Sequence, residues 1–332
     1  MRTTELGQND PVPSPPGSFC DAWLRAATGP DGFWSTTVPS AHFRTASTLG
    51  PELAQALATL LSQRPALRRV VELGAGDGSL LAGLRSDRPR LPLVGVDLRQ
   101  RPPGLDRSVG WLTDCWDVRR EAWTRGAVPA LLGDGVPTLV VAVEWLDDLP
   151  CPVAVPGSSG WRELDADLRP AGALGADDRA WLERWWPDGQ QVEVGRTRDA
   201  AWSSVVGGLR AAGGAALLVD YGHTRADRPA AGSLAAYQAG RAVEPRAVSD
   251  RNLTAHVAVD AVAAAGAAAG ATTVLAGRQD AVLPTLLPAV EPATGPLAAL
   301  ATRSRRRALT ASTGWGSHRW LLQEVPLVPV AT

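Results

Sequence analysis

The sequence predicts an α/β fold in which helices cover both faces of a mostly parallel sheet, and further helical or mixed insertions form a cap. Short apolar runs alternate with helical segments along much of the chain, as βαβ units require. The runs lack strict apolar–polar alternation, which is typical of parallel strands that are buried on both faces. The first run ends in closely spaced glycines, as a strand does before a tight turn into a helix.

Five runs are expected to form the core strands, and a sixth near the end of the chain is expected to close the sheet. In order they are RRVVELGAG, LPLVGVDL, VGWLTDCWD, VPTLVVAVEWLDDLP, GGAALLVDYGH and the terminal HRWLLQEVPLV. WRELDADL is a possible strand pair. The alanine-rich TAHVAVDAVAAAGAAAG is expected to be a helix, with His256 near its start.

These elements divide the chain into a core and a cap. The expected parts are a disordered tail at 1–18, an N-terminal helical segment of the cap at 19–65, a core at 66–150 and 213–224, substrate or cap insertions at 151–212 and 225–310, and a terminal core strand at 311–330. Each insertion would expose an apolar face alone, so the two are expected to pack together over one end of the sheet.

Composition excludes several kinds of chemistry. All cationic residues are arginine, so neither a lysine Schiff base nor a lysine-bearing phosphate loop is possible. The net charge of −1 gives no general field for nucleic acid, and the basic run at 303–307 is interpreted as a solvated helix face.

The cysteines and histidines are scattered without metal-ligand spacing, so no metal is expected. Three widely spaced cysteines fit a reduced, cytoplasmic chain. No apolar run is long enough to span a bilayer.

The glycine turn favours one cofactor class. Glycines stand at 74, 76 and 78, which gives GxGxG and not the GxGxxG of dinucleotide sites. The acid Glu72 precedes the turn, and a carboxylate there suits a cationic cofactor better than a pyrophosphate. Asp97 ends the second run, where an acid accepts hydrogen bonds from ribose hydroxyls.

S-adenosylmethionine is therefore the expected cofactor; NAD or FAD, and a purely structural turn, are the alternatives. The residues expected to bind it are Glu72, Gly74, Ala75, Gly76, Gly78, Asp97, Leu98, Asp114 beside the adenine, and Glu144.

Later segments resemble the MidA-like methyltransferases. They are HFRTASTLGPELAQAL, VVELGAGDGSLL, VVAVEWLDDLPC, WREL, QVEV, ALLVDYG, GSLAAYQ and NLTAHVAVDAV, in that order, and the resemblance covers roughly 28–325. It implies a class I methyltransferase fold with a Rossmann-like sheet. It also implies methylation of an arginine in a partner protein, since the family includes a mitochondrial enzyme that dimethylates an arginine of a complex I subunit during assembly.

The resemblance also aligns single residues. The family's Asn-Glu-Phe-Phe-Asp-Ala-Leu-Pro corresponds to residues 143–150, VEWLDDLP, which keep Glu144 and Asp147. The family's Asp-Leu-Thr-Ala-His-Val corresponds to residues 252–257, NLTAHV. ELGPGRG is ELGAGDG here, so proline and arginine are replaced by Ala75 and Asp77.

A guanidinium nucleophile needs carboxylates that hold its charge and accept its proton. Glu144, Asp147 and Asp220 are the expected catalytic residues, because they follow the fourth and fifth strands. Tyr221, Tyr237 and His256 are expected to contact substrate. Structural roles compete: Asp147 as a helix N-cap, Asp220 as a turn residue, His256 as a structural histidine.

Two other functions remain open. A small-molecule methyltransferase would use the long insertions to enclose a pocket. A binding or assembly factor would keep the fold and lose catalysis, as the changes at Ala75, Asp77 and Val143 allow. The sequence does not determine the oligomeric state.

Overall fold

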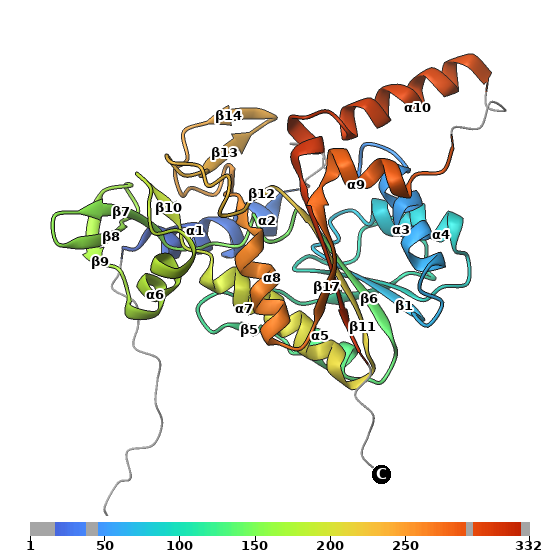
Figure 1. Cartoon of the computed structure of the whole chain (residues 1–332), viewed down its shortest axis with the longest axis horizontal. Coiled ribbons are helices and arrows are strands. Elements are labelled where there is room, and N and C mark those ends of the chain that lie inside the picture. The colour runs from blue at the N-terminus through green and yellow to red at the C-terminus, as the bar shows by residue number, and fades with distance from the viewer. Residues whose placement is uncertain (1–16, 38–45, 290–294, 327–332) are drawn as a thin grey trace, which may run out of the picture.

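The computed structural model describes residues 17–37, 46–289 and 295–326. Its centre is a seven-stranded sheet of order β17-β18-β11-β6-β1-β2-β3 (Figure 1). The strands are β1 Arg69–Leu73, β2 Leu93–Asp97, β3 Gly110–Thr113, β6 Thr138–Val143, β11 Gly214–Asp220, β17 Thr272–Arg278 and β18 Arg319–Val325. Within this sheet β18 runs antiparallel to both neighbours, and the other neighbouring pairs are parallel. The predicted fold class is confirmed.

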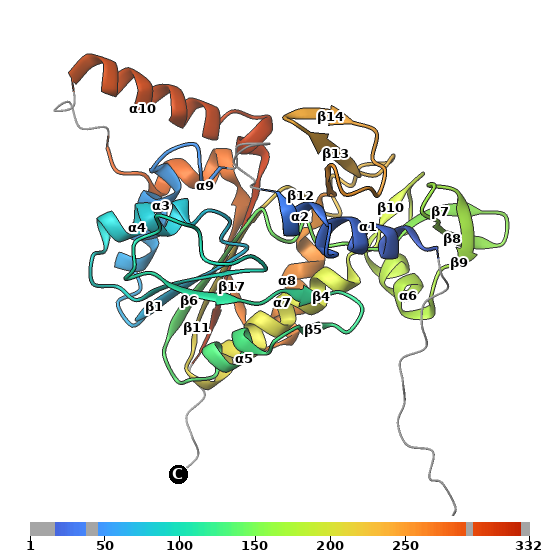
Figure 2. The same cartoon turned by 180° about the vertical axis from the view of Figure 1, so that it is seen from behind.

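Both faces of the sheet are buried by helices, as Figures 1 and 2 show from opposite sides. Successive strand residues point to opposite faces, so Val141 packs in one apolar cluster and Val140 in the other. The first face carries α3 Glu52–Ser62, α4 Ser79–Asp87 and α9 Gln279–Leu286. The second carries α5 Ala127–Leu132, α7 Arg196–Gly208 and α8 Val259–Ala268.

A second body of structure lies beside the sheet and forms the cap (Figure 1). It comprises α1 Phe19–Thr28, α2 Phe33–Thr36, β7 Val153–Gly157, β8 Gly160–Leu164, β9 Pro170–Ala173, α6 Ala176–Trp185, β10 Val192–Glu193, β13 Ala235–Gln238, β14 Arg241–Val243 and β15 Asn252–Thr254. One buried cluster joins Trp23 of α1 to Val153 of the first insertion and Leu253 of the second. The N-terminal helix and both insertions therefore pack together.

The division between core and cap differs from the predicted one. β17 and α8 fall within 225–310, which we assigned to a cap insertion, yet β17 lies in the central sheet and α8 packs on α7 and β18. Similarly, α3 flanks the sheet, although 19–65 was assigned to the cap. β17 was missed because it is a largely exposed edge strand and has no continuous apolar run. The predicted tail lies almost wholly outside the described residues.

Two local predictions also need correction. The helix predicted over TAHVAVDAVAAAGAAAG begins later than expected: His256 lies in the connection between β15 and β16 Val257–Ala258, and α8 starts at Val259. WRELDADL does not form a strand pair by itself, because only its first half is the strand β8, which pairs with β7 and β9.

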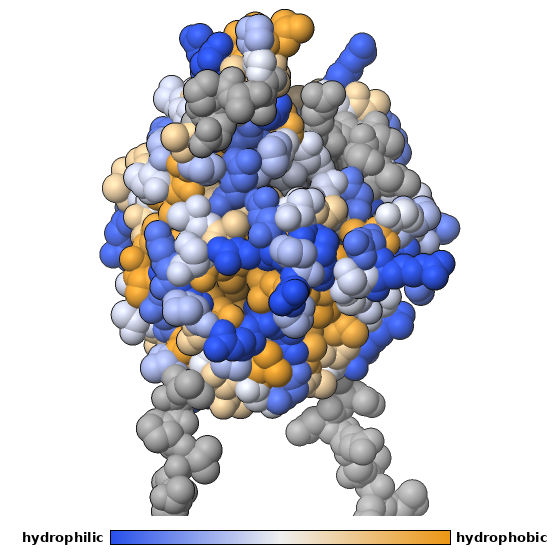
Figure 3. All heavy atoms as spheres, turned by 90° about the vertical axis from the view of Figure 1, so that its right-hand side faces the viewer, coloured by the Kyte–Doolittle hydropathy of each residue, from blue (hydrophilic) through white to orange (hydrophobic). Residues whose placement is uncertain are grey.

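Five shorter elements and one projecting helix complete the description. The short elements are β4 Trp116–Asp117, β5 Ala122–Trp123, η2 Leu209–Ala211, β12 Gly222–His223 and η4 Gly314–Ser317. The helix α10, Gly295–Leu309, projects from the body in both views (Figures 1 and 2). Hydrophilic and apolar residues are interspersed on the face seen in Figure 3. No helix among the described residues is long and apolar enough to cross a membrane.

Candidate active site

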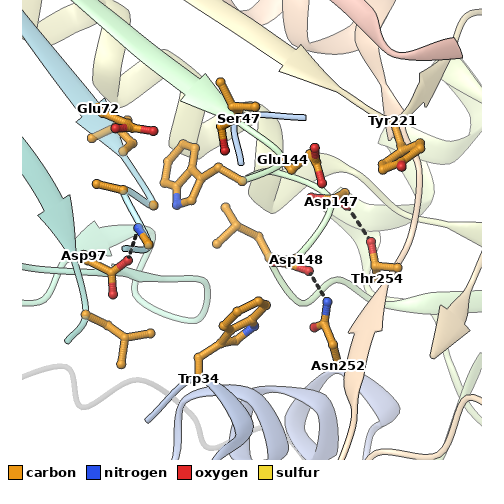
Figure 4. A pocket seen from close by; sticks show the side chains of 18 of the residues that line it. Trp34, Ser47, Glu72, Asp97, Glu144, Asp147, Asp148, Tyr221, Asn252 and Thr254 are labelled. Carbon is orange, nitrogen blue, oxygen red and sulfur yellow. Dashed lines mark hydrogen bonds between the residues drawn. The ribbon is translucent and has the colours of Figure 1, made fainter. Parts of the chain in front are cut away.

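A cavity of about 820 Å³ opens at the carboxyl ends of β1, β2, β6 and β11. The strands on either side of β1 are β2 and β6, so the strand order reverses beside β1, where open α/β sheets bind ligands. The volume lies in the upper part of the roughly 300–1,000 Å³ range of ligand pockets. Both predicted cofactor acids, Glu72 and Asp97, line this one cavity (Figure 4).

The glycine turn brings backbone close to the cavity. Gly74, Gly76 and Gly78 have φ angles of 64°, 58° and 77°, in the left-handed region that favours glycine. A Cβ atom on Gly74 would lie 2.9 Å from Cδ1 of Trp145, so the indole packs directly on the turn. Ala75, whose N–H donates to the carbonyl of Val96, fixes the turn to β2. The turn therefore presents backbone without glycine side chains to the cavity, and a hydrogen bond holds it against β2.

Asp97 is held at the end of β2 by two neighbours. One carboxylate oxygen accepts the N–H of Gly76 at 2.9 Å, and the other accepts the Nε–H of Arg99 at 2.9 Å. The carboxylate is 7% exposed and forms an ion pair with Arg99. Leu98, the next residue, also lines the cavity.

Glu72 supplies the strongest indication of a cationic ligand. It is 4% exposed, and its Oε2 has no hydrogen-bond partner in the described part of the chain. Burial first, and then Asp77 and Asp97, raise the pKa of this carboxyl well above its usual range. A buried acceptor without a donor is costly, and the ammonium of S-adenosylmethionine would supply such a donor.

Asp114 also borders the cavity, but its oxygens already have donors. They accept the backbone N–H groups of Arg125, Ala127 and Val128 and the hydroxyl of Thr124. The carboxylate therefore organises the segment that leads into α5. Its predicted contact with an adenine amino group stays a prediction.

A second group of carboxyls follows β6. Glu144 adopts φ +49°, a conformation that is strained for a residue with a side chain. Its Oε1 accepts the N–H of Ala46 at 2.8 Å. Burial, offset in part by this hydrogen bond, raises the pKa of Glu144 to about 8, and the neighbouring Asp147 adds to the rise.

Two pairs of side chains bind this segment to β15 (Figure 4). Thr254 donates its hydroxyl to Asp147 at 2.7 Å, and the amide of Asn252 donates to Asp148 at 3.0 Å. Burial raises the pKa of both aspartates. The chain turns at Asp147 and no helix begins directly after it, so Asp147 is not an N-cap.

Asp220, which we expected to be catalytic, does not reach the cavity. It is fully buried and is not among the residues that line the cavity. One oxygen accepts the backbone N–H groups of Trp145, Leu146 and Asp147, at 3.3, 2.9 and 3.4 Å. It therefore shapes the turn that presents Glu144. Burial and the nearby carboxyl of Asp147 raise its pKa well above the usual range.

The predicted substrate residues all line the cavity. The ring of Tyr221 stacks on His256, with centroids 5.8 Å apart and 15° between planes. Tyr237 is 41% exposed on the β13–β14 hairpin. The structure thus brings Tyr221, Tyr237 and His256 to the same cavity as the acids.

Sequence reasoning missed several residues here. Asp148 was visible only as a second acid beside Asp147, at a position where the resemblance has alanine. The ring of Trp145 stacks on that of Trp123, with centroids 5.8 Å apart and 3° between planes. Both rings line the cavity. His318, far along the chain, lies behind Glu144. No local motif marks a histidine that folding brings to a site from the residue just before the last strand.

A family model described as "Putative S-adenosyl-L-methionine-dependent methyltransferase" matches residues 96–276, just over half of the chain. No curated protein matches the chain.

Two solved structures from Burkholderia thailandensis share the fold. One, bound to S-adenosyl-homocysteine, is 23% identical with a TM-score of 0.72, over 92% of this chain and 87% of that chain. The other, an uncharacterised protein in a native crystal, is 24% identical with a TM-score of 0.72, over 92% and 86%.

The chain therefore belongs to this family of S-adenosyl-L-methionine-dependent methyltransferases. The reaction class and the cofactor predicted from the glycine turn and its acids are confirmed at the level of the family.

Proposed function

We propose that this family member transfers the methyl group of S-adenosylmethionine to the guanidinium of an arginine in a partner protein, as the resemblance to the MidA-like methyltransferases implies. The observation that carries the proposal is the acidic group Glu144, Asp147 and Asp148, which lines the same cavity as Glu72 and Asp97. None of the three forms an ion pair with an arginine among the described residues. Arg198 acts on the two aspartates only through its charge and not through an ion pair, so the group suits a cationic acceptor.

The nearest buried arginine does not meet this need. Arg198 is 1% exposed, and its guanidinium donates to backbone carbonyls, including those of Asp147, Leu149 and Ala255. It fixes the backbone under the acidic group, which leaves the carboxyls facing the cavity.

The cofactor-binding residues and the three carboxyls of the acidic group would have different roles in the reaction. The cofactor supplies an electrophilic methyl group on sulfur. Glu72, the glycine turn and Asp97 would hold it, while Asp147 and Asp148 would bind the guanidinium N–H groups. As the new N–CH₃ bond forms and the S–CH₃ bond breaks, the transferring nitrogen gives a proton to the Glu144 carboxylate.

A small molecule is the second candidate acceptor. Five indoles line the same cavity, from Trp34, Trp116, Trp123, Trp145 and Trp315, and aromatic walls are typical of small-molecule pockets. A planar cationic metabolite would fit both features.

Methyl transfer to a cell lysate distinguishes the two. The purified chain, tritiated S-adenosylmethionine and a lysate of the cells that encode the chain are incubated, and the products are separated by size and hydrolysed. We expect label in protein, recovered as methylarginine. Asp148→Asn should lose most of it, whereas Asp87→Asn, at an exposed position at the end of α4, should keep it. Label confined to small molecules would contradict the protein substrate.

A further inference from the structure

A histidine with no hydrogen-bond partner lies against the proposed base. His318 is fully buried, and neither ring nitrogen has a hydrogen-bond partner among the described residues. Its Nε2 lies 3.7 Å from Oε1 of Glu144. That distance is too long for a hydrogen bond, yet catalytic hydrogen bonds often tighten only when substrate is bound. Buried polar atoms without partners are rare and call for an explanation.

The fold holds the imidazole in this place. His318 follows η4 and directly precedes β18. Its backbone N–H donates to Trp315 at 3.1 Å, and its carbonyl accepts from Gln279 at 2.8 Å. The ring packs on Tyr221, with centroids 4.1 Å apart. Backbone and ring are thus fixed, so the approach to Glu144 results from the fold.

We propose that His318 is a positioning residue for Glu144, and that its neutral imidazole accepts at Nε2 a hydrogen bond from the protonated carboxyl of Glu144. This inference rests on the proposed function, in which Glu144 takes the proton of the transferring nitrogen. The hydrogen bond would aim the second carboxyl oxygen into the cavity. It would also favour the protonated form, which must form during methyl transfer.

The surrounding charges agree with a neutral imidazole beside a protonated carboxyl. Burial lowers the pKa of His318 to about 3, and burial raises that of Glu144 to about 8. The titratable and charged groups that act on one or both members, on the acids beside them or on the adjacent Tyr221 come from several elements. They are Asp147, Asp148, Arg198, Asp220, Tyr221, Tyr237 and His256.

The pair would then act in sequence. In the free protein Glu144 keeps its proton at neutral pH, and Nε2 accepts from it. An incoming guanidinium favours the carboxylate, so one proton leaves to solvent. After transfer the carboxyl regains a proton from the substrate nitrogen, Nε2 accepts again, and the cationic product loses its counter-charge.

Nitrogen-15 spectra of the full chain, saturated with S-adenosyl-homocysteine, test the contact without any methyl acceptor. His318 is assigned by the loss of its signals in His318→Gln. We expect a neutral ring down to pH 5, and an Nε2 signal that shifts with a midpoint near pH 8, as Glu144 does. The step should vanish in Glu144→Gln. An imidazolium above pH 6, or a step that survives this change, would overturn the proposal.

Kinetics test the consequence on the labelled acceptor. His318→Phe keeps a ring against Tyr221 but removes the acceptor, so kcat should fall by about tenfold or more while KM stays within about threefold. The acid limb of its pH profile should move to lower pH. His318→Gln, which keeps an acceptor, should retain the limb. An unchanged kcat and pH profile in His318→Phe would refute the role.

The two experiments separate the two claims. If no acceptor is labelled by the wild-type chain, the proposed function fails, and the spectra still decide whether Glu144 and His318 are coupled. If His318→Phe does not fold, the wild-type and Glu144→Gln spectra decide the same point.

Discussion

Carboxyl groups at neighbouring positions in this cavity have different tasks, because their partners differ. Asp97 accepts from Gly76 and Arg99, whereas Oε2 of Glu72 has no donor among the described residues. Asp220 shapes a turn, and Asp147 and Asp148 are tied to β15. Residue type alone does not reveal these tasks.

Asp148 and Asn252 offer a test by exchange. One carboxylate and one amide share a hydrogen bond of 3.0 Å, and the resemblance has alanine and aspartate at these positions. Asp148→Asn should lower methyl transfer by about tenfold. Asn252→Asp should place two carboxyls in contact and destabilise the fold. The double variant, which keeps one charge and one amide, should recover most of the activity. A double variant no better than either single one would contradict a shared role.

Glu144 gives the protein a pH-dependent stability. Its pKa is about 8 in the fold and near 4.5 in the unfolded chain. The folded state therefore binds more protons between these values, so this group's contribution to stability is greatest below pH 4.5 and falls as pH rises to 8, by roughly 1.4 kcal/mol per unit at most.

Urea unfolding at pH 5 to 8 checks this prediction. Glu144→Gln should flatten the decline of the unfolding free energy with pH, and Asp87→Asn should leave it unchanged. The decline will not vanish, because Glu72, Asp148 and Asp220 have raised pKa values as well. Equal slopes in wild type and Glu144→Gln would rule out a high pKa for Glu144.

The glycine turn permits a prediction at the scale of elements. Gly74 and Gly76 have nearly equal positive φ angles, so alanine at either costs about 1–2 kcal/mol of backbone strain. At Gly74 the new methyl would also meet Trp145 at 2.9 Å, whereas at Gly76 the nearest atom is 3.9 Å away. Gly74→Ala should therefore be the less stable variant.

Thermal melts of the two variants measure the difference. A lower melting temperature for Gly76→Ala than for Gly74→Ala would show that the indole of Trp145 does not pack on the turn.

The strands that carry the site could be predicted from the sequence, because β1, β2, β6 and β11 are buried on both faces and read as apolar runs. The glycines and acids at their ends could be placed for the same reason. β17 could not, because an exposed edge strand lacks that pattern. Nor could His318, since its contact with Glu144 depends on how the last strand returns through the sheet.

At the scale of the whole molecule, the site is formed jointly by the core sheet and the cap. The strand ends supply Glu72, Asp97 and Glu144, and the cap supplies Tyr237, Asn252 and Thr254 to the same cavity. Trp23, Val153 and Leu253 pack the cap as one unit from segments far apart in sequence. The family match at residues 96–276 spans elements of both the core and the cap, and the proposed acceptor depends on how the cap completes the cavity.

Calorimetric titration of S-adenosyl-homocysteine into the purified chain tests most directly the claim that the cavity beside β1 holds the cofactor. We predict one binding site, an affinity about ten- to a hundredfold lower in Asp97→Asn, and no change in Asp87→Asn. NAD should not bind, because the acid Glu72 beside the glycine turn is unfavourable for an anionic pyrophosphate. Absence of binding to the wild-type chain, or an affinity that Asp97→Asn leaves unchanged, would contradict this account.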